Sequence, residues 1–517
     1  MFSISSLLAC VLGALGLGLS WRYVGRVFFT PLRTLRGPRN PNLFYGHARQ
    51  VCRPGHTTIT SKWMQEYGNK VLTRWLFSTP CLWTADPQVI RHVLQSYNYV
   101  KPWEMRISAA RVVGDSVLVA EGLCNPAFGQ AQIRELAHIF VQKSVELRDV
   151  WTDEIAAQGG RARINILEGL KKMTLDVIGL AGFDYHLEAL NSRGKPNELN
   201  EAFSQIFSST PPLSIYRIVV SIAPFLDFFP DERARKVQEA NVAMRRIGLQ
   251  LIHDKKAAIL RELGNKDGSI DKKDLPGRDL LTLLIKANMA TDLPENQRLS
   301  DEEVLARVFF LVAGHETTST AAAWCLFALT QNPDVQRKLR EELLAVPTEF
   351  PTMDELAALP YLDWVVRETL RLHAPVTWTL RSAGVDDVIP VSEPYVDRYV
   401  IMSILSVHHS KAIWGEDALE FKPERWEHPP ETISEIPSVW GHMLTFSAGP
   451  HACIGYRLSL AELRALMFIL VRAFEFELAV KPDDVTAVGM FTQRPAVRSE
   501  AAKGAQMPLI IRPYVRT

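Results

Sequence analysis

The strongest signal in this sequence is the run Phe446-Ser447-Ala448-Gly449-Pro450-His451-Ala452-Cys453-Ile454-Gly455. Its glycines and its proline predict a loop. The apolar periodicity of residues 456–474 predicts a helix directly after it. A cysteine just before a helix amino terminus lies near backbone N–H groups that favour negative charge. We therefore expect Cys453 to be held as a thiolate that can ligate a metal.

This loop resembles the haem-binding signature of the cytochrome P450 superfamily, Phe-x-x-Gly-x-Arg-x-Cys-x-Gly. Phe446, Gly449, Cys453 and Gly455 match the signature, and His451 stands where the family has arginine. The resemblance implies that Cys453 is the proximal ligand of a haem b iron and that His451 contacts a haem propionate. Thiolate ligation favours cleavage of the O–O bond, so the implied activity is that of a haem-thiolate monooxygenase.

Two other interpretations of Cys453 are open when the residues are taken singly. A lone cysteine in a loop is most often a buried structural thiol. Cys453 with His442 and His451 would supply three ligands of a zinc site, but the sequence offers no fourth ligand at a sensible spacing. The complete ten-residue pattern favours haem over both.

A second motif, Ala313-Gly314-His315-Glu316-Thr317-Thr318, lies within residues 304–330, whose apolar periodicity predicts a long helix. Ser300 and Glu303 form a capping box at the start of this helix. Glycine inside a helix costs about 1 kcal/mol relative to alanine, so a role other than helix formation must favour it here. A polar cluster or a notch in the core is the alternative, because short motifs recur easily.

This motif is similar to the P450 oxygen-activation motif, Ala/Gly-Gly-x-Asp/Glu-Thr. The resemblance implies that the helix passes over the haem, with Ala313 against the cofactor and Gly314 leaving room for dioxygen. It also implies that Thr317 hydrogen-bonds the bound dioxygen and that Glu316 relays protons. We expect a mostly apolar substrate pocket near four residues of this helix, Phe309, Phe310, Ala313 and Thr318.

Three further charged residues are expected to be structural. Glu368 and Arg371 share a face of the predicted helix 359–373, although such a pair taken alone is an ordinary surface ion pair worth roughly 0–1 kcal/mol. Residues 423–426 resemble the P450 Pro-Glu-Arg-Phe element, which implies that Arg425 joins Glu368 and Arg371 in a buried triad. Arg381 matches a strand arginine of the family, which implies that it binds a haem propionate.

The remainder of the chain predicts a mainly α fold with a small β region. Of its 517 residues 47% are hydrophobic and 22% are charged, which is typical of a protein with a large core. Strand patterns occur at residues 71–77 and 80–84, and a helix is expected after Asp86 and Pro87. Helical periodicity dominates residues 130–346, where strand signals nearly vanish and residues 264–278 predict a solvated loop. We expect one haem-binding catalytic domain over residues 56–517.

The amino terminus predicts a membrane anchor. Residues 2–20 carry no charged side chain, and five arginines follow between Arg22 and Arg39. We therefore expect a transmembrane helix over residues 1–21, a connector without regular structure over residues 22–55, and a catalytic domain in the cytosol, anchored to the endoplasmic reticulum. A cleaved signal peptide is the alternative; against it, the positive charge follows the apolar run instead of preceding it.

Charge and motifs also limit the partners. The net charge of +1 and the lack of a basic run with interleaved aromatics argue against nucleic acid. Six cysteines spread over the chain fit a reducing compartment. Because no Gly-x-Gly-x-x-Gly fingerprint occurs, we expect electrons from a separate NADPH-dependent reductase. Membrane lipid and a small lipophilic substrate, such as a terpenoid or another secondary metabolite, complete the expected partners.

The sequence departs from the P450 pattern at two places. In the first, Gly122 runs directly into Leu123, where the family has a helix whose basic residues hold a haem propionate. In the second, the strand pair that the family has after the position of Tyr399 is missing. Either the enzyme is divergent or the recorded sequence lacks short coding segments. These departures keep a haem-deficient, inactive membrane protein as an alternative. An isomerase, dehydratase or peroxygenase of the same fold is another, although such enzymes tend to lose the acid–threonine pair that Glu316 and Thr317 provide.

Overall fold

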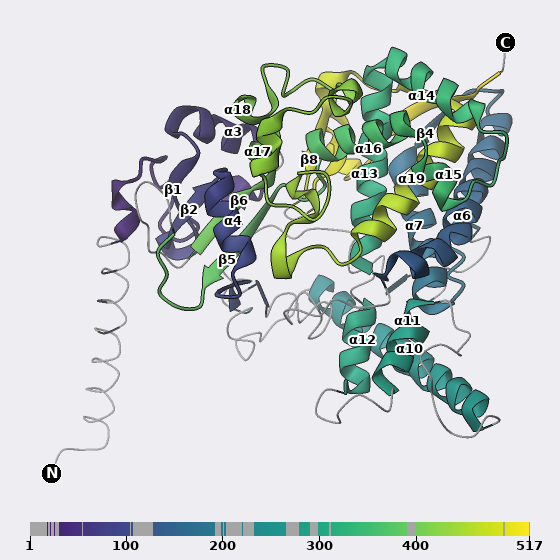
Figure 1. Cartoon of the computed structure of the whole chain (residues 1–517), viewed down its shortest axis with the longest axis horizontal. Helices are drawn as coiled ribbons and strands as arrows, with labels where there is room; N and C mark the ends of the chain where they lie inside the picture. Colours follow the sequence, from purple (N-terminus) through teal and green to yellow (C-terminus); the bar gives the residue numbers. More distant parts are fainter. Residues whose placement is uncertain are drawn as a thin grey trace.

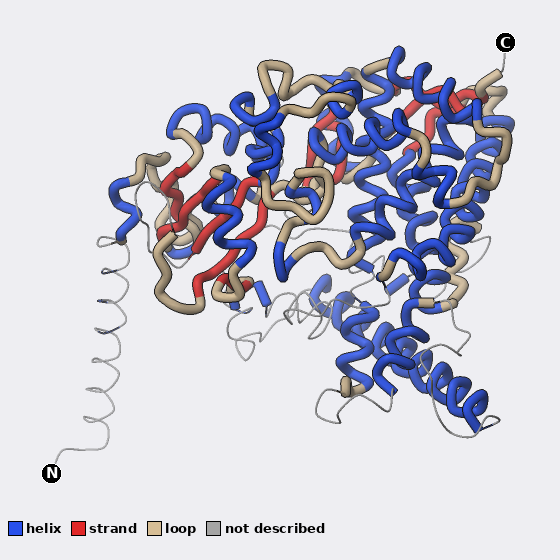
Figure 2. Tube along the Cα trace, viewed as in Figure 1, coloured by secondary structure: helices blue, strands red, loops and turns tan. Residues whose placement is uncertain are grey.

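The computed structural model of the protein describes residues 30–515 with internal gaps, and Gly18, Trp21 and Gly25 before them. The gaps are residues 54, 104, 107–127, 192–197, 200, 203–219, 221–231, 265–278, 290–297, 310–311, 390–398 and 490–491. Helices dominate, and the largest sheet lies at one end of the molecule, away from the long helices (Figures 1 and 2). The predicted class, mainly α with a small β region, is confirmed.

The largest sheet has five strands in the order β1-β2-β6-β5-β3. The strands are β1 (Lys70–Arg74), β2 (Pro80–Thr84), β3 (Tyr99–Val100), β5 (Trp378–Ala383) and β6 (Tyr399–Ser403). Only β2 and β6 pair in parallel; the other neighbours are antiparallel. The predicted strand at residues 80–84 is confirmed. The one at 71–77 ends too late, because residues 76–78 form a 3-10 turn in which Phe77 takes a positive φ.

Short helices flank this sheet. They are η1 (Pro31–Thr34), α2 (Ala48–Val51), α3 (His56–Tyr67) and α4 (Pro87–Gln95). Asp86 caps α4 by accepting hydrogen bonds from the next two backbone N–H groups after Pro87, as its position before a proline predicts. The connector was expected to lack regular structure, and this is wrong for η1 and α2. The Thr30 hydroxyl caps η1, and Pro31 suits its first turn.

Four long helices form the centre of the largest hydrophobic core. They are α6 (Gln130–Ala157), α7 (Ile166–Phe183), α13 (Val312–Gln331) and α19 (Tyr456–Ala473). Helix α13 packs against α7 and α19, and α19 also packs against α6. The six residues from Ala321 to Leu326 are all buried, so this part of α13 is covered on every side, as a helix that is apolar all round requires.

The other helices cover this core. They are α10 (Glu232–Gly264), α11 (Leu280–Met289), α12 (Asp301–Phe309), α14 (Pro333–Ala345), α15 (Met353–Ala357) and α16 (Pro360–Leu372). The predicted capping box is present, because Ser300 Oγ accepts from the Glu303 N–H and the Glu303 carboxylate accepts from the Ser300 N–H. The helix expected over residues 304–330 is seen as α12 and α13, with residues 310–311 outside the described part.

Smaller elements complete the fold. Strands β4 (Ala162–Asn165), β10 (Pro508–Pro513) and β7 (Phe474–Leu478) form one sheet, and β8 (Val485–Val488) pairs with β9 (Arg494–Val497). We call residues 444–455, which carry Cys453, the cysteine loop. Before it in the chain come α17 (Ile404–His408), α18 (Lys411–Trp414) and the 3-10 turns η6 (Pro423–Trp426) and η7 (Glu431–Glu435). Strand β4 was not expected in the helical middle of the chain. Its pairing partner, β10, lies near the carboxyl terminus, beyond any local sequence window.

Several expectations fall outside the described residues. These are the anchor over residues 1–21 apart from Gly18 and Trp21, the loop at 265–278, and the departure at Gly122. Of the departure near Tyr399, the preceding residues 390–398 lie outside and β6 begins at Tyr399 itself. Within the described part of the chain, no helix combines the length and the apolar character that crossing a bilayer requires.

One residue of the core carries an unusual charge state. Glu462 on α19 is fully buried, and neither carboxyl oxygen has a hydrogen-bond partner among the described residues. Burial raises the pKa of Glu462 well above its ordinary value of 4.5. The folded chain therefore keeps this proton while the unfolded chain loses it, so stability is fully present below about pH 4.5 and falls as the pH rises toward the folded pKa.

We expect Glu462→Gln, which cannot ionise, to unfold at a higher denaturant concentration than the wild-type protein at pH 8. The advantage should grow by up to about 1.4 kcal/mol per pH unit above 4.5 and vanish near pH 4.5. Glu341→Gln, on an exposed face of α14, is the control and should show no such trend. A Glu462→Gln protein that is less stable than wild type at pH 8 would mean that the carboxylate is charged and partnered.

Candidate active site

The cysteine loop is closed by its own backbone. It contains the 3-10 turns η8 (Leu444–Phe446) and η9 (Gly449–His451), and Cys453 lies three residues before α19. The Cys453 N–H donates to the Phe446 carbonyl at 2.8 Å. The Phe446 ring is buried between Trp440 and Tyr456, with ring centroids 5.7 Å and 6.0 Å away. Phe446 therefore ties the start of the loop to the helix that follows it.

Gly449 is the residue at which the loop meets the five-stranded sheet region. Its φ is +65°, a conformation that favours glycine. A Cβ at this position would lie 2.1 Å from the backbone carbonyl oxygen of Leu94, at the end of α4. Gly455 is different, because its φ is −88° and a Cβ there would make only an ordinary contact 3.9 Å from Phe128. Of the two glycines predicted for the cysteine loop, Gly449 is the one that packing of the protein itself requires.

The protonation of Cys453 corrects our expectation from sequence. Burial raises the pKa of the Cys453 thiol to about 11, and a hydrogen bond with the Gly455 backbone lowers it only in part. The loop and the helix terminus alone therefore do not hold a thiolate at neutral pH. A metal ion would, because a coordinated thiol is deprotonated outright. Cys453 is thus arranged to become a thiolate on binding a metal.

Basic side chains gather beside the loop. The His451 ring bonds to the Tyr99 backbone, and its buried Nε2 atom has no hydrogen-bond partner among the described residues. Burial, followed by the charges of Arg381 and Lys101, lowers the pKa of His451 to about 4. Arg381 is buried on β5 and donates from Nη1 to the Thr379 hydroxyl at 2.7 Å. This cluster of one histidine and two cations suits carboxylate groups.

The oxygen-activation motif lies within α13. The Thr317 hydroxyl donates to the Ala313 carbonyl at 2.9 Å, one turn earlier. Among the described residues, a Cβ on Gly314 would meet Ile178 alone, at an ordinary 3.5 Å, so packing within this part of the chain does not demand glycine here. Thr318 is fully buried and its hydroxyl lies 3.0 Å from Ser459 Oγ on α19. This contact assigns Thr318 to helix packing, not to the expected pocket.

Glu316 is held by a side chain that the sequence did not indicate. Arg494 on β9 approaches it with Nη1 3.3 Å from Glu316 Oε1, and both side chains are largely buried. Burial lowers the pKa of Lys171 on α7, while the Glu316 charge opposes this shift. Two cations thus face Glu316, Lys171 from α7 and Arg494 from β9.

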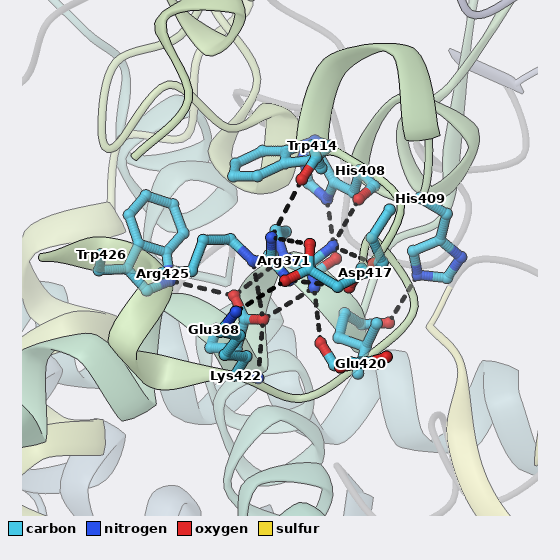
Figure 3. Close-up of polar contacts among 12 residues, drawn as sticks. Glu368, Arg371, His408, His409, Trp414, Asp417, Glu420, Lys422, Arg425 and Trp426 are labelled. Carbon is cyan, nitrogen blue, oxygen red and sulfur yellow. Dashed lines mark hydrogen bonds and ion pairs between the residues drawn. The ribbon is translucent and has the colours of Figure 1, made fainter. Parts of the chain in front are cut away.

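The three charged residues predicted to be structural meet in one buried cluster, with Arg371 at its centre (Figure 3). Glu368 and Arg371 are fully buried and form two parallel hydrogen bonds of 2.8 Å and 2.9 Å. Arg425 Nε lies 3.3 Å from the same Glu368 carboxylate, and its Nη1 donates to Asp417 at 2.6 Å. Arg425, with Lys422, lowers the pKa of Asp417 to about 2. Each charge in the cluster has an opposite charge beside it.

The Arg371 guanidinium also organises the chain around it. Its remaining donors bond to the carbonyls of His408, Ala418 and Glu420 at 2.7 Å, 2.6 Å and 3.1 Å (Figure 3). Glu368 accepts in addition from the Lys422 N–H and the Trp426 indole. Helix α16 therefore holds residues 408–426, which run past the cysteine loop, through buried bonds to charged groups.

Comparison with known proteins decides the family. The family model described as Cytochrome P450 matches residues 35–496. The chain belongs to the cytochrome P450 family. It is 50% identical to cytochrome P450 monooxygenase 205 of Postia placenta, with 94% of this chain and 93% of the relative covered. Cytochrome P450 monooxygenase 128 of the same fungus is also 50% identical, with 95% of each chain covered. The chain is thus a P450 monooxygenase, an enzyme of a family that uses haem.

A third relative is less similar to this chain in sequence. Ganoderic acid synthetase of Ganoderma lucidum is 30% identical over 80% of this chain and 83% of its own length. The alignment with monooxygenase 205 has 510 positions, but 94% of this 517-residue chain is only about 486 residues. The remaining positions of the alignment are residues that monooxygenase 205 has and this chain lacks. Insertions and deletions therefore separate this P450 even from relatives at half identity.

Sequence reasoning missed three side chains that the fold brings to the P450 site. Lys101 follows β3, which pairs with β5 at Ser382, one residue after Arg381. Arg494 reaches Glu316 from a strand 178 positions away in the chain. Lys171 faces the same carboxylate from α7. Only strand register and helix packing place these cations, and no local pattern marks them.

Other expected features of the P450 site are less fully described. The expected pocket residue Phe310 and the side chain of Phe309 lie outside the described residues, and Ala313 is half-buried on α13. For the alternative zinc site, the described part of the chain holds no group of three or more His, Cys, Asp or Glu side chains that could bind a metal ion. His442 and His451 therefore do not join Cys453 in such a group.

We expect Gly449→Ala to destabilise the P450 far more than φ strain alone, because its methyl group would collide with the Leu94 carbonyl. Gly55→Ala is the matched control, since Gly55 has φ +73° and ψ +15°, in the left-handed helical region, with nothing within 4 Å of an added Cβ. The control should cost about 1 kcal/mol of unfolding free energy and Gly449→Ala at least about twice that, as measured by denaturant titration. Equal costs would mean that the loop and α4 separate freely.

Proposed function

We propose that this P450 is a haem-thiolate monooxygenase that inserts one oxygen atom of dioxygen into a lipophilic substrate. The observation that carries the proposal is the closed loop of Cys453 with the basic cluster of His451, Arg381 and Lys101 beside it. A buried thiol next to donors suited to carboxylates matches the two chemical features of haem b, an iron that takes an axial ligand and a pair of propionates.

Each residue of the loop would hold a different part of the cofactor. Cys453 would ligate the iron and lose its proton on doing so. The other ring nitrogen of His451 already bonds to the Tyr99 backbone, so His451 would donate from Nε2 only as the doubly protonated ring, which an adjacent propionate would favour. Arg381 and Lys101 would supply further positive charge. Phe446, whose ring lies between Trp440 and Tyr456, would line the haem site, and Gly449 keeps the loop against α4.

On the other side, α13 supplies the groups that handle oxygen and protons. When bound, haem supplies the activation of dioxygen. Gly314 presents no side chain on α13, and among the described residues an added Cβ would meet Ile178. The Thr317 hydroxyl donates to the Ala313 carbonyl, so its oxygen can accept a hydrogen bond. Glu316, which lies beside Arg494, can take up a proton at its carboxylate and pass it on.

The rival functions have less support. An isomerase, a dehydratase or a peroxygenase would not need the acid–threonine pair, which is placed here beside Gly314. A haem-deficient protein is favoured only by the departures near Gly122 and Tyr399. The residues that monooxygenase 205 has and this chain lacks agree with a recorded sequence that is missing short coding segments.

Partners and location follow from chemistry and charge. Electrons would come from a separate NADPH-dependent reductase, because no dinucleotide fingerprint occurs. The uncharged residues 2–20 followed by arginines support a single-pass anchor in the endoplasmic reticulum with the domain in the cytosol. The relative named ganoderic acid synthetase supports a substrate among terpenoids or other secondary metabolites.

The deciding experiment is the carbon monoxide difference spectrum of the reduced full-length protein. We expect a thiolate-type Soret band in the wild type and in Cys52→Ala, which removes a thiol far from the loop. Cys453→Ala should lose the band, and its haem content should fall by at least about tenfold. Haem content is measured separately, as pyridine haemochrome.

Two outcomes would contradict the proposal. A Cys453→Ala protein that retains the thiolate-type band would show that another residue ligates the iron. A wild-type protein that folds and takes up no haem would show that this chain, as recorded, is not a functional monooxygenase.

A further inference from the structure

His408 connects the buried charged cluster to the cysteine loop. It is the last residue of α17 and is fully buried. Its Nδ1 lies 3.1 Å from the Arg371 carbonyl, and the Leu444 N–H donates to its Nε2 at 2.9 Å. Figure 3 shows His408 beside Arg371, whose guanidinium also bonds to the His408 carbonyl at 2.7 Å. Both the ring and the backbone of His408 are therefore engaged with α16.

These contacts determine the state of the ring. A backbone N–H can only donate, so Nε2 must be unprotonated to accept from Leu444. The ring proton then lies on Nδ1 and is donated to the Arg371 carbonyl. Burial, with smaller contributions from His409 and Arg371, lowers the pKa of His408 to about 3. The neutral ring thus has one defined tautomer, and both nitrogens are used.

The Leu444 amide lies at the start of the loop that presents Cys453. Leu444 begins η8, and its carbonyl accepts from the Ser447 N–H at 2.8 Å. Two residues after Leu444, the Phe446 carbonyl accepts from the Cys453 N–H at 2.8 Å. Hydrogen bonds therefore join Arg371 to His408 and His408 to Leu444, the backbone of η8 joins Leu444 to Phe446, and Phe446 bonds to Cys453. A second hydrogen bond joins the cysteine loop to α16, because the Thr445 hydroxyl donates to the Leu370 carbonyl at 2.9 Å.

We propose that His408 is a positioning residue for Cys453, because its Nε2 holds the Leu444 amide and so orients the loop that carries the ligand. His408 touches neither Cys453 nor the reacting atoms, and its effect passes through η8. The inference rests on the proposed function only in taking Cys453 as the iron ligand. Without the Nε2 acceptor, the Leu444 N–H would be buried with no partner, and the loop would open to satisfy it.

Two substitutions separate the two bonds of the ring. His408→Asn places an amide near the position of Nδ1 and no atom at Nε2, so it removes the acceptor for Leu444. His408→Gln places an amide oxygen near the position of Nε2 and can restore that acceptor. The matched control is His409→Asn, because His409 is the next residue, is also largely buried, and its ring bonds to the Leu372 carbonyl at 3.0 Å.

The first measurement is hydrogen–deuterium exchange of the peptide 441–447 in the purified full-length protein. We expect His408→Asn to speed exchange of the Leu444 amide by about fivefold or more, as the loss of one buried hydrogen bond implies. His408→Gln and His409→Asn should stay within about twofold of the wild type. Equal exchange in His408→Asn and His409→Asn overturns the proposal, and so does a failure of His408→Gln to restore protection. If His408→Asn does not fold, a folded His408→Gln protein that leaves Leu444 unprotected likewise overturns it.

The second measurement is the thiolate-type fraction of the carbon monoxide complex at equal haem content. His408→Asn should lower this fraction by at least about twofold, and His408→Gln should restore it. A general loss of stability would lower haem content in both His408 variants and in His409→Asn without changing the fraction. Absence of the band from the wild type refutes the proposed function, whereas the exchange comparison still tests the positioning by itself.

Discussion

The bidentate pair between Glu368 and Arg371 is the interaction on which the cysteine side of this P450 depends. It is fully buried, so removing one partner would leave an uncompensated charge at a cost of about 3–5 kcal/mol. The pair is stable here because every remaining donor and acceptor is used, by Arg425, by the Trp426 indole and by backbone carbonyls. The segment 408–426 contains only the short elements α18 and η6, and bonds to the charged groups of α16 hold it in place.

Local patterns in the sequence predicted the parts of the site that are local in the chain. The Ser300–Glu303 box, the Asp86 cap and the loop before α19 need only neighbouring residues, and the structure has them at these positions. Arg494 and Lys101 could not be predicted in this way. They reach the site through strand β9 and the pairing of β3 with β5, which depend on the tertiary fold. The resemblance to P450s placed the Glu368 triad, which spacing alone did not distinguish from a surface pair.

The position of Cys453 before a helix predicted a lowered thiol pKa, but burial raises this pKa instead. A helix amino terminus stabilises an anion by about 0.3–1 kcal/mol. The rise of the Cys453 pKa from 9.0 to about 11 corresponds to about 3 kcal/mol against the anion. Desolvation therefore outweighs the helix terminus by a clear margin. The fold supplies a loop closed by its own backbone around Cys453, and a thiolate charge would come only with a bound metal.

The three histidines around Arg371 have a consequence for the conditions in which this P450 persists. Burial lowers the pKa values of His373, His408 and His409 to about 3, 3 and 4, from an ordinary 6.5. The unfolded chain takes up these protons first, so below about pH 6.5 each ring favours unfolding by about 1.4 kcal/mol per pH unit. Burial also lowers the pKa values of His47 and His56, which lie beside the five-stranded sheet. A weakly acidic extraction or storage buffer therefore lowers the stability of the folded chain through both regions, the one around Arg371 and the one beside this sheet.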